Sequence, residues 1–132
     1  MLLSASQIEG VGTTTFRRQL DRALSREVVD FGLLDASSRI AFLDLGVSCA
    51  RAAGLRTGQA IASYVLGACY LDVRFESSSA LLTALLASTL PELRKVHAMN
   101  EWASCLIGNP GNIDQADDAV RRAALLTRAW TN

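Results

Sequence analysis

Apolar residues recur at helical spacing along most of this chain, and two neighbouring segments are apolar nearly all round. Residues 57–71 contain no charged side chain. Wound at the helical period, residues 40–53 place apolar side chains on two opposite sides and leave a narrow polar strip of Asp44, Ser48 and Arg51. A helix of this kind is buried, in a membrane or in a protein core. The pattern therefore predicts a buried antiparallel helical hairpin over about residues 38–71. Four side chains are expected to be almost fully buried there: Leu43, Val47, Ile61 and Val65.

The turn of this hairpin is specified by local chemistry. Gly54 can adopt the left-handed conformation that ends a helix, and Leu55 can pack back onto the last turn. Thr57 is a good N-cap for the next helix. Gly46 and Gly67 lie inside the two helices, where each costs about 1 kcal/mol relative to Ala, so we expect another backbone to approach closely at both.

Further helical patterns flank the hairpin. The first begins at Thr13, Thr14 or Thr15 and is expected to reach about Phe31. Its apolar stripe consists of Phe16, Leu20, Leu24, Val28 and Phe31. A short leucine-rich helix follows a cap at Ser77. A longer one begins at Pro91 and reaches about Ile107, and the last is capped by Asp114. The inner edge expected for the longer helix is Leu93, Val96, Met99 or Asn100, Ala103 and Leu106.

These segments predict an all-α fold. We expect a compact bundle of five to six helices around the buried hairpin, and neither a strand nor an internal repeat is visible in the sequence. Residues 1–12 show no periodicity and are interpreted as a flexible arm, which leaves residues 13–132 as a single helical-bundle domain.

Composition and net charge limit the classes of partner that this chain can bind. The 13 basic residues balance the 13 acidic ones, which argues against nucleic-acid binding, because such binding needs a surplus of Lys and Arg. A chain with almost no net charge repels other proteins little, so binding to another protein or formation of a homo-oligomer is compatible with its charge. The uncharged run at 57–71 is shorter than the roughly 20 residues of a membrane span. The first twelve residues lack the basic start and apolar core of a signal peptide, so we expect a cytoplasmic location.

Residues suited to catalysis are sparse. The cysteines, Cys49, Cys69 and Cys105, form no CxxC pair and sit among apolar neighbours, as buried free thiols do. His97 is the single histidine and would lie about 12 Å from Cys105 along one helix, too far for a nucleophile pair. The carboxylates near residue 114 suit helix capping better than calcium binding. We therefore predict a non-enzymatic protein with no cofactor and no metal.

The best candidates for partner contact are arginines and aromatic residues outside the hairpin. Arg18, Arg22 and Arg26 recur every four residues opposite the first apolar stripe. They form either a docking strip for an anion or partner, or a solvated face whose charge Asp21, Glu27 and Asp30 balance. The hairpin is expected to be too apolar to lie outside, so the other candidates flank it. They are Arg74, Phe75, and Trp102 or Trp130. The alternative is that both tryptophans are packed inside, which fits Trp130 at least as well.

One family resemblance rests on the centre of the chain. Residues 50–57 (Ala-Arg-Ala-Ala-Gly-Leu-Arg-Thr), the apolar run 61–66, Arg74-Phe75 and the leucine-rich segment resemble small helical accessory proteins of bacterial type VI secretion gene clusters. The similarity covers about residues 39–95 and involves packing positions. It implies a non-enzymatic co-effector or adaptor that binds a secreted toxin or its delivery spike and is carried out with it. An immunity protein that neutralises a toxin is the alternative. A further alternative is an enzyme or ligand-binding bundle that uses His97 and a cysteine.

Overall fold

The described part of the chain is entirely helical. The computed structural model describes the backbone of residues 14–131 and the side chains of residues 15–123. Within these residues there are seven α-helices, one short 3-10 helix and no strand. The elements are α1 (Thr14–Glu27), α2 (Val29–Gly32), α3 (Ala36–Ala53), α4 (Gly58–Tyr70), η2 (Phe75–Ser78), α5 (Ala80–Ala87), α6 (Glu92–Gly108) and α7 (Ile113–Thr131). The all-α bundle predicted from the sequence is confirmed, although the described residues form seven helices where five to six were expected, because the first predicted helix is divided at Val28 into α1 and α2. The arm predicted over residues 1–12 lies outside the described residues.

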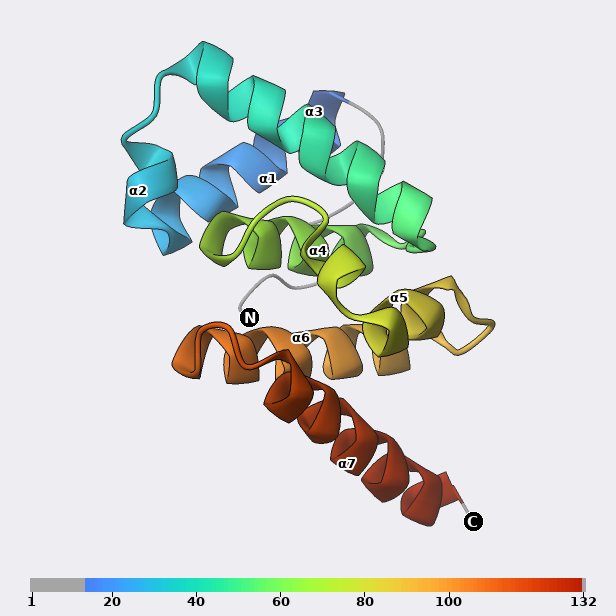
Figure 1. Ribbon diagram of the computed structural model, residues 1–132. Coiled ribbons are helices and arrows are strands. Elements are labelled where there is room, and N and C mark those ends of the chain that lie inside the picture. Colours follow the sequence, from blue (N-terminus) through green and yellow to red (C-terminus); the bar gives the residue numbers. More distant parts are fainter. Residues whose placement is uncertain (1–13, 132) are drawn as a thin grey trace.

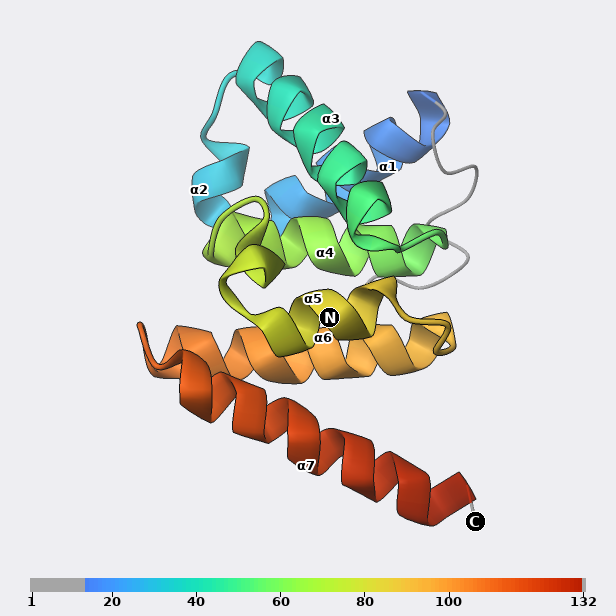
Figure 2. The same cartoon turned by 45° about the vertical axis from the view of Figure 1, so that its right-hand side comes forward.

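Helix α4 occupies the middle of the bundle. Figures 1 and 2 show α1 and α3 on one side of it and α6 on the other, with α7 on the far side of α6. Residues 60–65 and Ala68 of α4 are all buried. This uncharged helix has neighbours on two sides, so almost its whole surface is removed from water.

The antiparallel hairpin exists, but its two helices are buried to different extents. Leu43, Ile61 and Val65 are inaccessible to solvent as predicted, whereas Val47 is only half-buried. Helix α3 uses one face to contact α4, α1 and α5. On its other sides Ile40 and Leu45 are exposed, so the expectation that both hairpin helices lie inside is wrong for α3. Periodicity identified an apolar helix, but the number of neighbours that cover such a helix is a tertiary property.

The hairpin turn follows its sequence closely. Gly54 has φ 115°, and the Leu55 N–H donates to the carbonyl of Ala50 at 3.1 Å, which ends α3 as predicted. A Cβ on Gly54 would collide with the backbone carbonyl of Leu86 at the end of α5. The Thr57 hydroxyl accepts a hydrogen bond from the Ala60 N–H at 3.2 Å and caps α4.

Gly46 and Gly67, the two glycines inside these helices, contact side chains and not the backbone of another helix. A Cβ on Gly46 would lie 3.1 Å from a methyl group of Val65, and one on Gly67 would lie 3.2 Å from the ring of Phe75. The expected backbone approach at these positions is therefore wrong. Each glycine instead makes room for a large side chain of the core.

Helix ends differ from the sequence-based expectations at several places. The first predicted helix is interrupted at Val28, which is extended with φ −118° and ψ 105°, although all five residues of its apolar stripe are buried. Ser79, not Ser77, caps α5 by accepting from the Leu82 N–H at 3.1 Å. Asn112, not Asp114, caps α7 through the Gln115 N–H at 3.0 Å.

The buried edge of α6 is rotated from the one expected. Leu93 is exposed, while Lys95, Ala98, Met99, Trp102 and Ala103 are buried. Val96 and Leu106 are only partly covered. The helix is apolar on more than one side, so its sequence alone did not decide which side meets the core.

Candidate partner-binding surface

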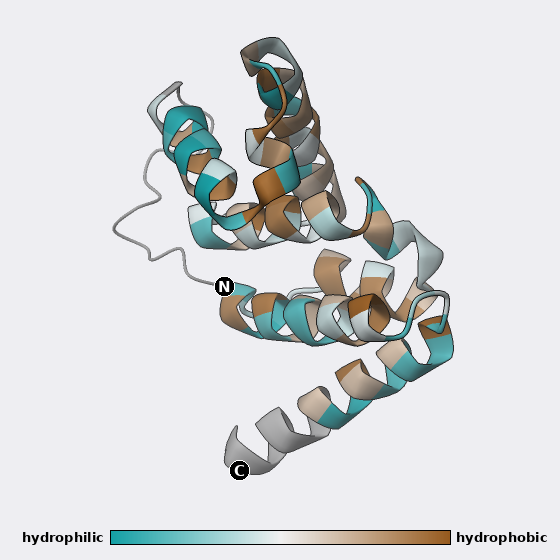
Figure 3. Ribbon diagram, turned by 90° about the vertical axis from the view of Figure 1, so that its left-hand side faces the viewer, coloured by the Kyte–Doolittle hydropathy of each residue, from teal (hydrophilic) through white to brown (hydrophobic). Residues whose placement is uncertain are grey.

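The three arginines on the outer face of α1 are exposed and unpaired. Arg18, Arg22 and Arg26 form no ion pair with any carboxylate of the described residues. We call these three side chains the arginine strip. Figure 3 shows α1 largely in hydrophilic colours beside the more hydrophobic α3. The strip therefore adds three positive charges to one face of a chain whose net charge is zero.

One of the three carboxylates that could balance this strip is engaged elsewhere. Asp21 accepts a hydrogen bond from Arg39 Nε at 2.9 Å, and Arg39 also donates to the carbonyl of Leu34. On the same side of α1, Arg17 pairs with Asp44 at 3.2 Å. These two ion pairs hold α1 against α3. Asp21 therefore pairs with α3 and not with the arginine strip. Glu27 and Asp30, the other carboxylates of the solvated-face interpretation, are exposed and form no ion pair within residues 15–123, so that interpretation stays a prediction.

A shallow groove accompanies the strip. It has a volume of about 230 Å³ and is lined by Gln19, Arg22, Ala23 and Arg26. The small side chain of Ala23 leaves this depression between longer neighbours. Two guanidinium groups at the edge of a groove can each bind a carboxylate through parallel N–H donors.

Exposed apolar side chains follow directly after the strip. Of the nine large apolar residues that are exposed in the described part of the chain, five lie between residues 29 and 45. Val29 at the start of α2 and Leu33 immediately after its end are 72% and 79% exposed. Leu34, Ile40 and Leu45 continue this series into α3. Single exposed apolar residues are ordinary, but this concentration next to unpaired arginines is typical of a binding surface.

Two residues that the sequence placed at the interface are core residues instead. Phe75 is buried and stacks between Tyr64 and Trp102, with ring centroids 4.9 Å and 6.0 Å away. Trp102 has no exposed surface. Neither side chain is accessible to a partner in this structure, and both are corrected to packing residues. The side chain of Trp130 lies outside the described residues.

A polar contact explains how the Trp102 indole is accommodated inside. The indole N–H of Trp102 donates to Asp117 Oδ1 at 2.9 Å, and the Ser79 hydroxyl donates to the same oxygen at 2.6 Å. This arrangement joins α6, α7 and the start of α5. Trp is tolerated in a core when its N–H finds an acceptor, so Asp117 has a structural role that the sequence did not reveal.

Arg74 is exposed, as a contact residue must be, but its backbone has a structural role. It has φ 64°, an uncommon conformation for a residue with a side chain. Its N–H donates to the Tyr64 hydroxyl at 2.9 Å, and that hydroxyl donates to the buried Glu76 carboxylate at 2.8 Å. Burial, and then the bond to Glu76, raise the pKa of Tyr64 far above its usual value, so the phenol stays protonated.

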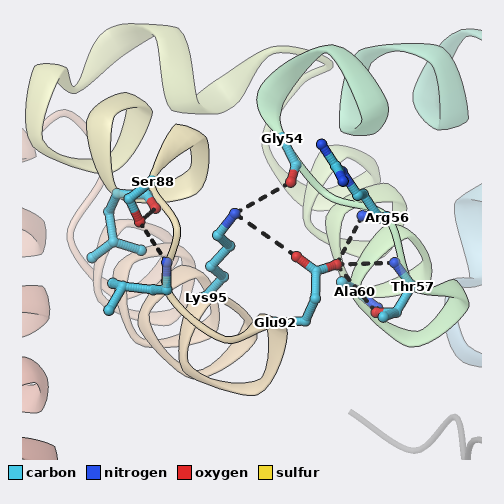
Figure 4. Close-up of polar contacts among 9 residues, drawn as sticks. Gly54, Arg56, Thr57, Ala60, Ser88, Glu92 and Lys95 are labelled. Atoms are coloured by element: carbon cyan, nitrogen blue, oxygen red, sulfur yellow. Dashed lines mark hydrogen bonds and ion pairs between the residues drawn. The ribbon is translucent and has the colours of Figure 1, made fainter.

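A second polar cluster joins α6 to the hairpin turn. Glu92 Oε1 accepts hydrogen bonds from the N–H groups of Arg56 and Thr57 at 2.8 and 2.9 Å, and Oε2 lies 3.8 Å from Lys95 Nζ. Lys95 is only 4% exposed and donates to the carbonyl of Gly54 at 3.3 Å. Figure 4 shows Lys95 between Gly54 and Glu92. Glu92 suits the positive end of the dipole of its own helix, and its carboxylate also caps α4 through the Thr57 N–H.

The residues considered for catalysis are not brought into a recognisable site. His97 is exposed on α6, Cys49 is buried, and Cys69 and Cys105 are partly buried. Burial raises the pKa of the Cys69 thiol to about 11, which disfavours the reactive thiolate at neutral pH. Within residues 15–123, no three His, Cys, Asp or Glu side chains are grouped so that they could hold a metal ion.

Comparisons with protein families, with characterised proteins and with solved structures find no match to this chain. None of the helices in the described part is long and apolar enough to cross a membrane.

Proposed function

We propose that this protein is a small, non-enzymatic helical module that binds another protein through the arginine strip of α1. The observation that carries the proposal is that three exposed arginines in a row have no ion-pair partner among the described residues, while their neighbours Arg17 and Asp21 are paired. A row of unpaired positive charge on a well-packed scaffold steers a complementary partner and orients it on contact.

The type VI resemblance suggests what kind of partner this is. An adaptor or co-effector would bind a secreted toxin or a component of its delivery spike. An immunity protein would cover the active site of a toxin. Both roles need a rigid surface with complementary charge, and neither needs catalytic residues. The adaptor role is proposed first, because it is what the resemblance implies, and the immunity role is the alternative.

Reversal of the strip tests this function. The triple variant Arg18→Glu, Arg22→Glu and Arg26→Glu should fold normally, because all three side chains are exposed and have no ion-pair partner within residues 15–123. Expressed as tagged bait in the native host, the wild-type chain should retain one protein partner in stoichiometric amount. The triple variant should lose it, and the complex should dissociate as NaCl is raised.

The control reverses three exposed arginines elsewhere, Arg51, Arg121 and Arg122. Arg121 pairs with Asp118 at 2.7 Å, but both side chains are more than half exposed, so loss of this pair changes stability little. The control changes the net charge by the same amount and should retain the partner. Equal retention by both variants, with no dependence on salt, would refute the strip as the binding surface. Recovery of a toxin whose activity the chain abolishes would favour the immunity role, whereas recovery of a spike component would favour the adaptor role.

The enzyme or ligand-binding alternative makes a different prediction. It requires that His97 and a cysteine act together and that a small molecule stays with the purified chain. Native mass spectrometry of the purified protein distinguishes these cases, because a retained small molecule adds a fixed mass and a protein partner adds a far larger one.

A further inference from the structure

The arginine strip has a spacing that suits one class of partner. We propose that it binds an acidic α-helix of another protein whose carboxylates recur at every fourth residue and whose last turn carries an apolar side chain. This inference rests on the proposed protein-binding function and specifies the surface that the partner presents.

The first argument is geometrical. Arg18, Arg22 and Arg26 follow each other at intervals of four residues in one regular helix, so they span about 12 Å with steps of about 6 Å. A second helix with Asp or Glu at the same intervals has the same steps. Two helices that lie side by side can therefore form three ion pairs in register, which an irregular acidic loop does only by chance.

The second argument concerns which charged groups already have an ion-pair partner. Asp21 and Asp44 are held by Arg39 and Arg17 at the interface between α1 and α3. Of the carboxylates in residues 15–123, none pairs with the strip. Each guanidinium group can therefore bind a carboxylate of another protein without first breaking an ion pair within residues 15–123. The groove beside Ala23 lies between Arg22 and Arg26 and gives one such side chain a place to enter.

The third argument is the apolar end of the surface. α2 begins two residues after α1 ends, and Val29 at its start and Leu33 just after its end are both exposed. Charged pairs at a rim contribute mainly orientation and association rate, while affinity needs apolar contact. A helix that continues past the strip would bring an apolar residue of its last turn onto these two side chains.

A nucleic acid is the competing class of partner, and the charge distribution disfavours it. The chain has no net positive charge, and the strip offers three basic groups. The apolar side chains of α2 have no complement on a phosphate backbone. Binding to nucleic acid rests on many phosphate contacts, whereas binding to a helix needs a few pairs in register and an apolar anchor.

The probe is a fluorescent, alanine-rich peptide of 18 residues, which we call the row peptide. It carries three glutamates at intervals of four residues and a leucine one helical turn after the last of them. A control peptide of the same composition distributes the three glutamates around the helix. Circular dichroism establishes that the two peptides are equally helical. Fluorescence anisotropy with the full chain should give affinity at least about tenfold higher for the row peptide than for the control. Reversal of the strip should abolish this difference, and reversal of Arg51, Arg121 and Arg122 should preserve it.

Substitution of Val29 and Leu33 by Ser should weaken binding of the row peptide severalfold without changing its salt dependence. Equal affinity for the two peptides would overturn the inference, and so would tighter binding of a 20-base-pair DNA duplex than of the row peptide. If the peptides fail while capture of the native partner still depends on the strip, the proposed function stands and the acidic-helix inference alone is refuted. If capture is also independent of the strip, both are refuted.

Discussion

Removal of the Glu92 carboxylate should loosen the junction between α6 and the hairpin turn. This carboxylate accepts from the N–H groups of Arg56 and Thr57, accepts from the Thr57 hydroxyl at 3.3 Å, and lies near the ammonium group of Lys95. Glu92→Ala deletes all of these contacts at once. Lys95, whose side chain is only 6% exposed, then keeps the Gly54 carbonyl as its one hydrogen-bond partner within residues 15–123.

The magnitude follows from the solvent access of each partner. A hydrogen bond to a charged group contributes about 1.5–3 kcal/mol when it is shielded from water. The two N–H groups are near the surface, so water replaces much of their loss, while the buried ammonium of Lys95 cannot be rehydrated. We therefore expect a loss of about 2–3 kcal/mol in the free energy of unfolding for Glu92→Ala. Glu92→Gln keeps an acceptor oxygen for the N–H groups and should lose about 1 kcal/mol.

The same contacts make this contribution depend on pH. Burial raises the pKa of Glu92. The hydrogen bonds from Thr57 and Arg56 and the charge of Lys95 together lower this pKa by more than burial raises it, so in the folded state it lies below the ordinary 4.5. A depressed carboxyl pKa stabilises the folded state above the unfolded value and loses that effect as pH falls through the folded value. The stability difference between wild type and Glu92→Gln should therefore be full at pH 6 and shrink below about pH 4.5.

Urea unfolding followed by circular dichroism measures these quantities. Glu101→Ala is the matched control, because Glu101 is exposed on the same helix and should change stability by less than about 0.5 kcal/mol. The reasoning fails if Glu92→Ala is as stable as wild type at pH 7. It also fails if the difference between wild type and Glu92→Gln stays constant down to the lowest pH at which both fold.

Three further predictions concern the core and the residues considered for chemistry. Val65→Asp would place an unpaired charge in the fully buried centre of α4 and should prevent folding, seen as loss of the helical circular dichroism signal. Tyr64→Phe leaves the buried Glu76 carboxylate without its hydroxyl donor and should cost about 2–3 kcal/mol in urea unfolding; a change below about 0.5 kcal/mol would contradict this. His97→Gln and Cys105→Ser should each leave partner capture unchanged, and loss of capture by a folded variant would favour the enzyme alternative.

Local sequence was sufficient for the features that depend on a few adjacent residues. Thr57 caps the helix after the turn as predicted. At the start of α3 the sequence offers Asp35, Ser37 and Ser38 as caps, and Asp35 is the one used, accepting from the Ser38 N–H at 3.2 Å. The left-handed Gly54 and the buried Leu55 end α3 as predicted. Capping and helix termination involve groups within about one turn of each other, so their chemistry can be read directly from neighbouring letters.

Only the tertiary structure decided which apolar surfaces are covered. Helices α3 and α4 are both rich in apolar residues, but α4 has α3 and α6 on either side, while α3 leaves Leu45 51% exposed. Trp102 was a candidate for an interface or for the interior, and it lies in the core, where Asp117, fifteen residues away, accepts its N–H. The periodicity of a helix gives the direction of each side chain but not the number of neighbours around it.

The arginine strip shows both sides of this division. The four-residue spacing in the sequence placed Arg18, Arg22 and Arg26 on one face, and the regular helix keeps them there. Whether Asp21 neutralises that face depended on a residue eighteen positions away, because Arg39 on α3 binds its carboxylate. Ion pairs between distant segments exist only once the helices are packed. The sequence therefore determined where the charges stand along each helix, and the packing of α1 on α3 determined which of them remain unpaired.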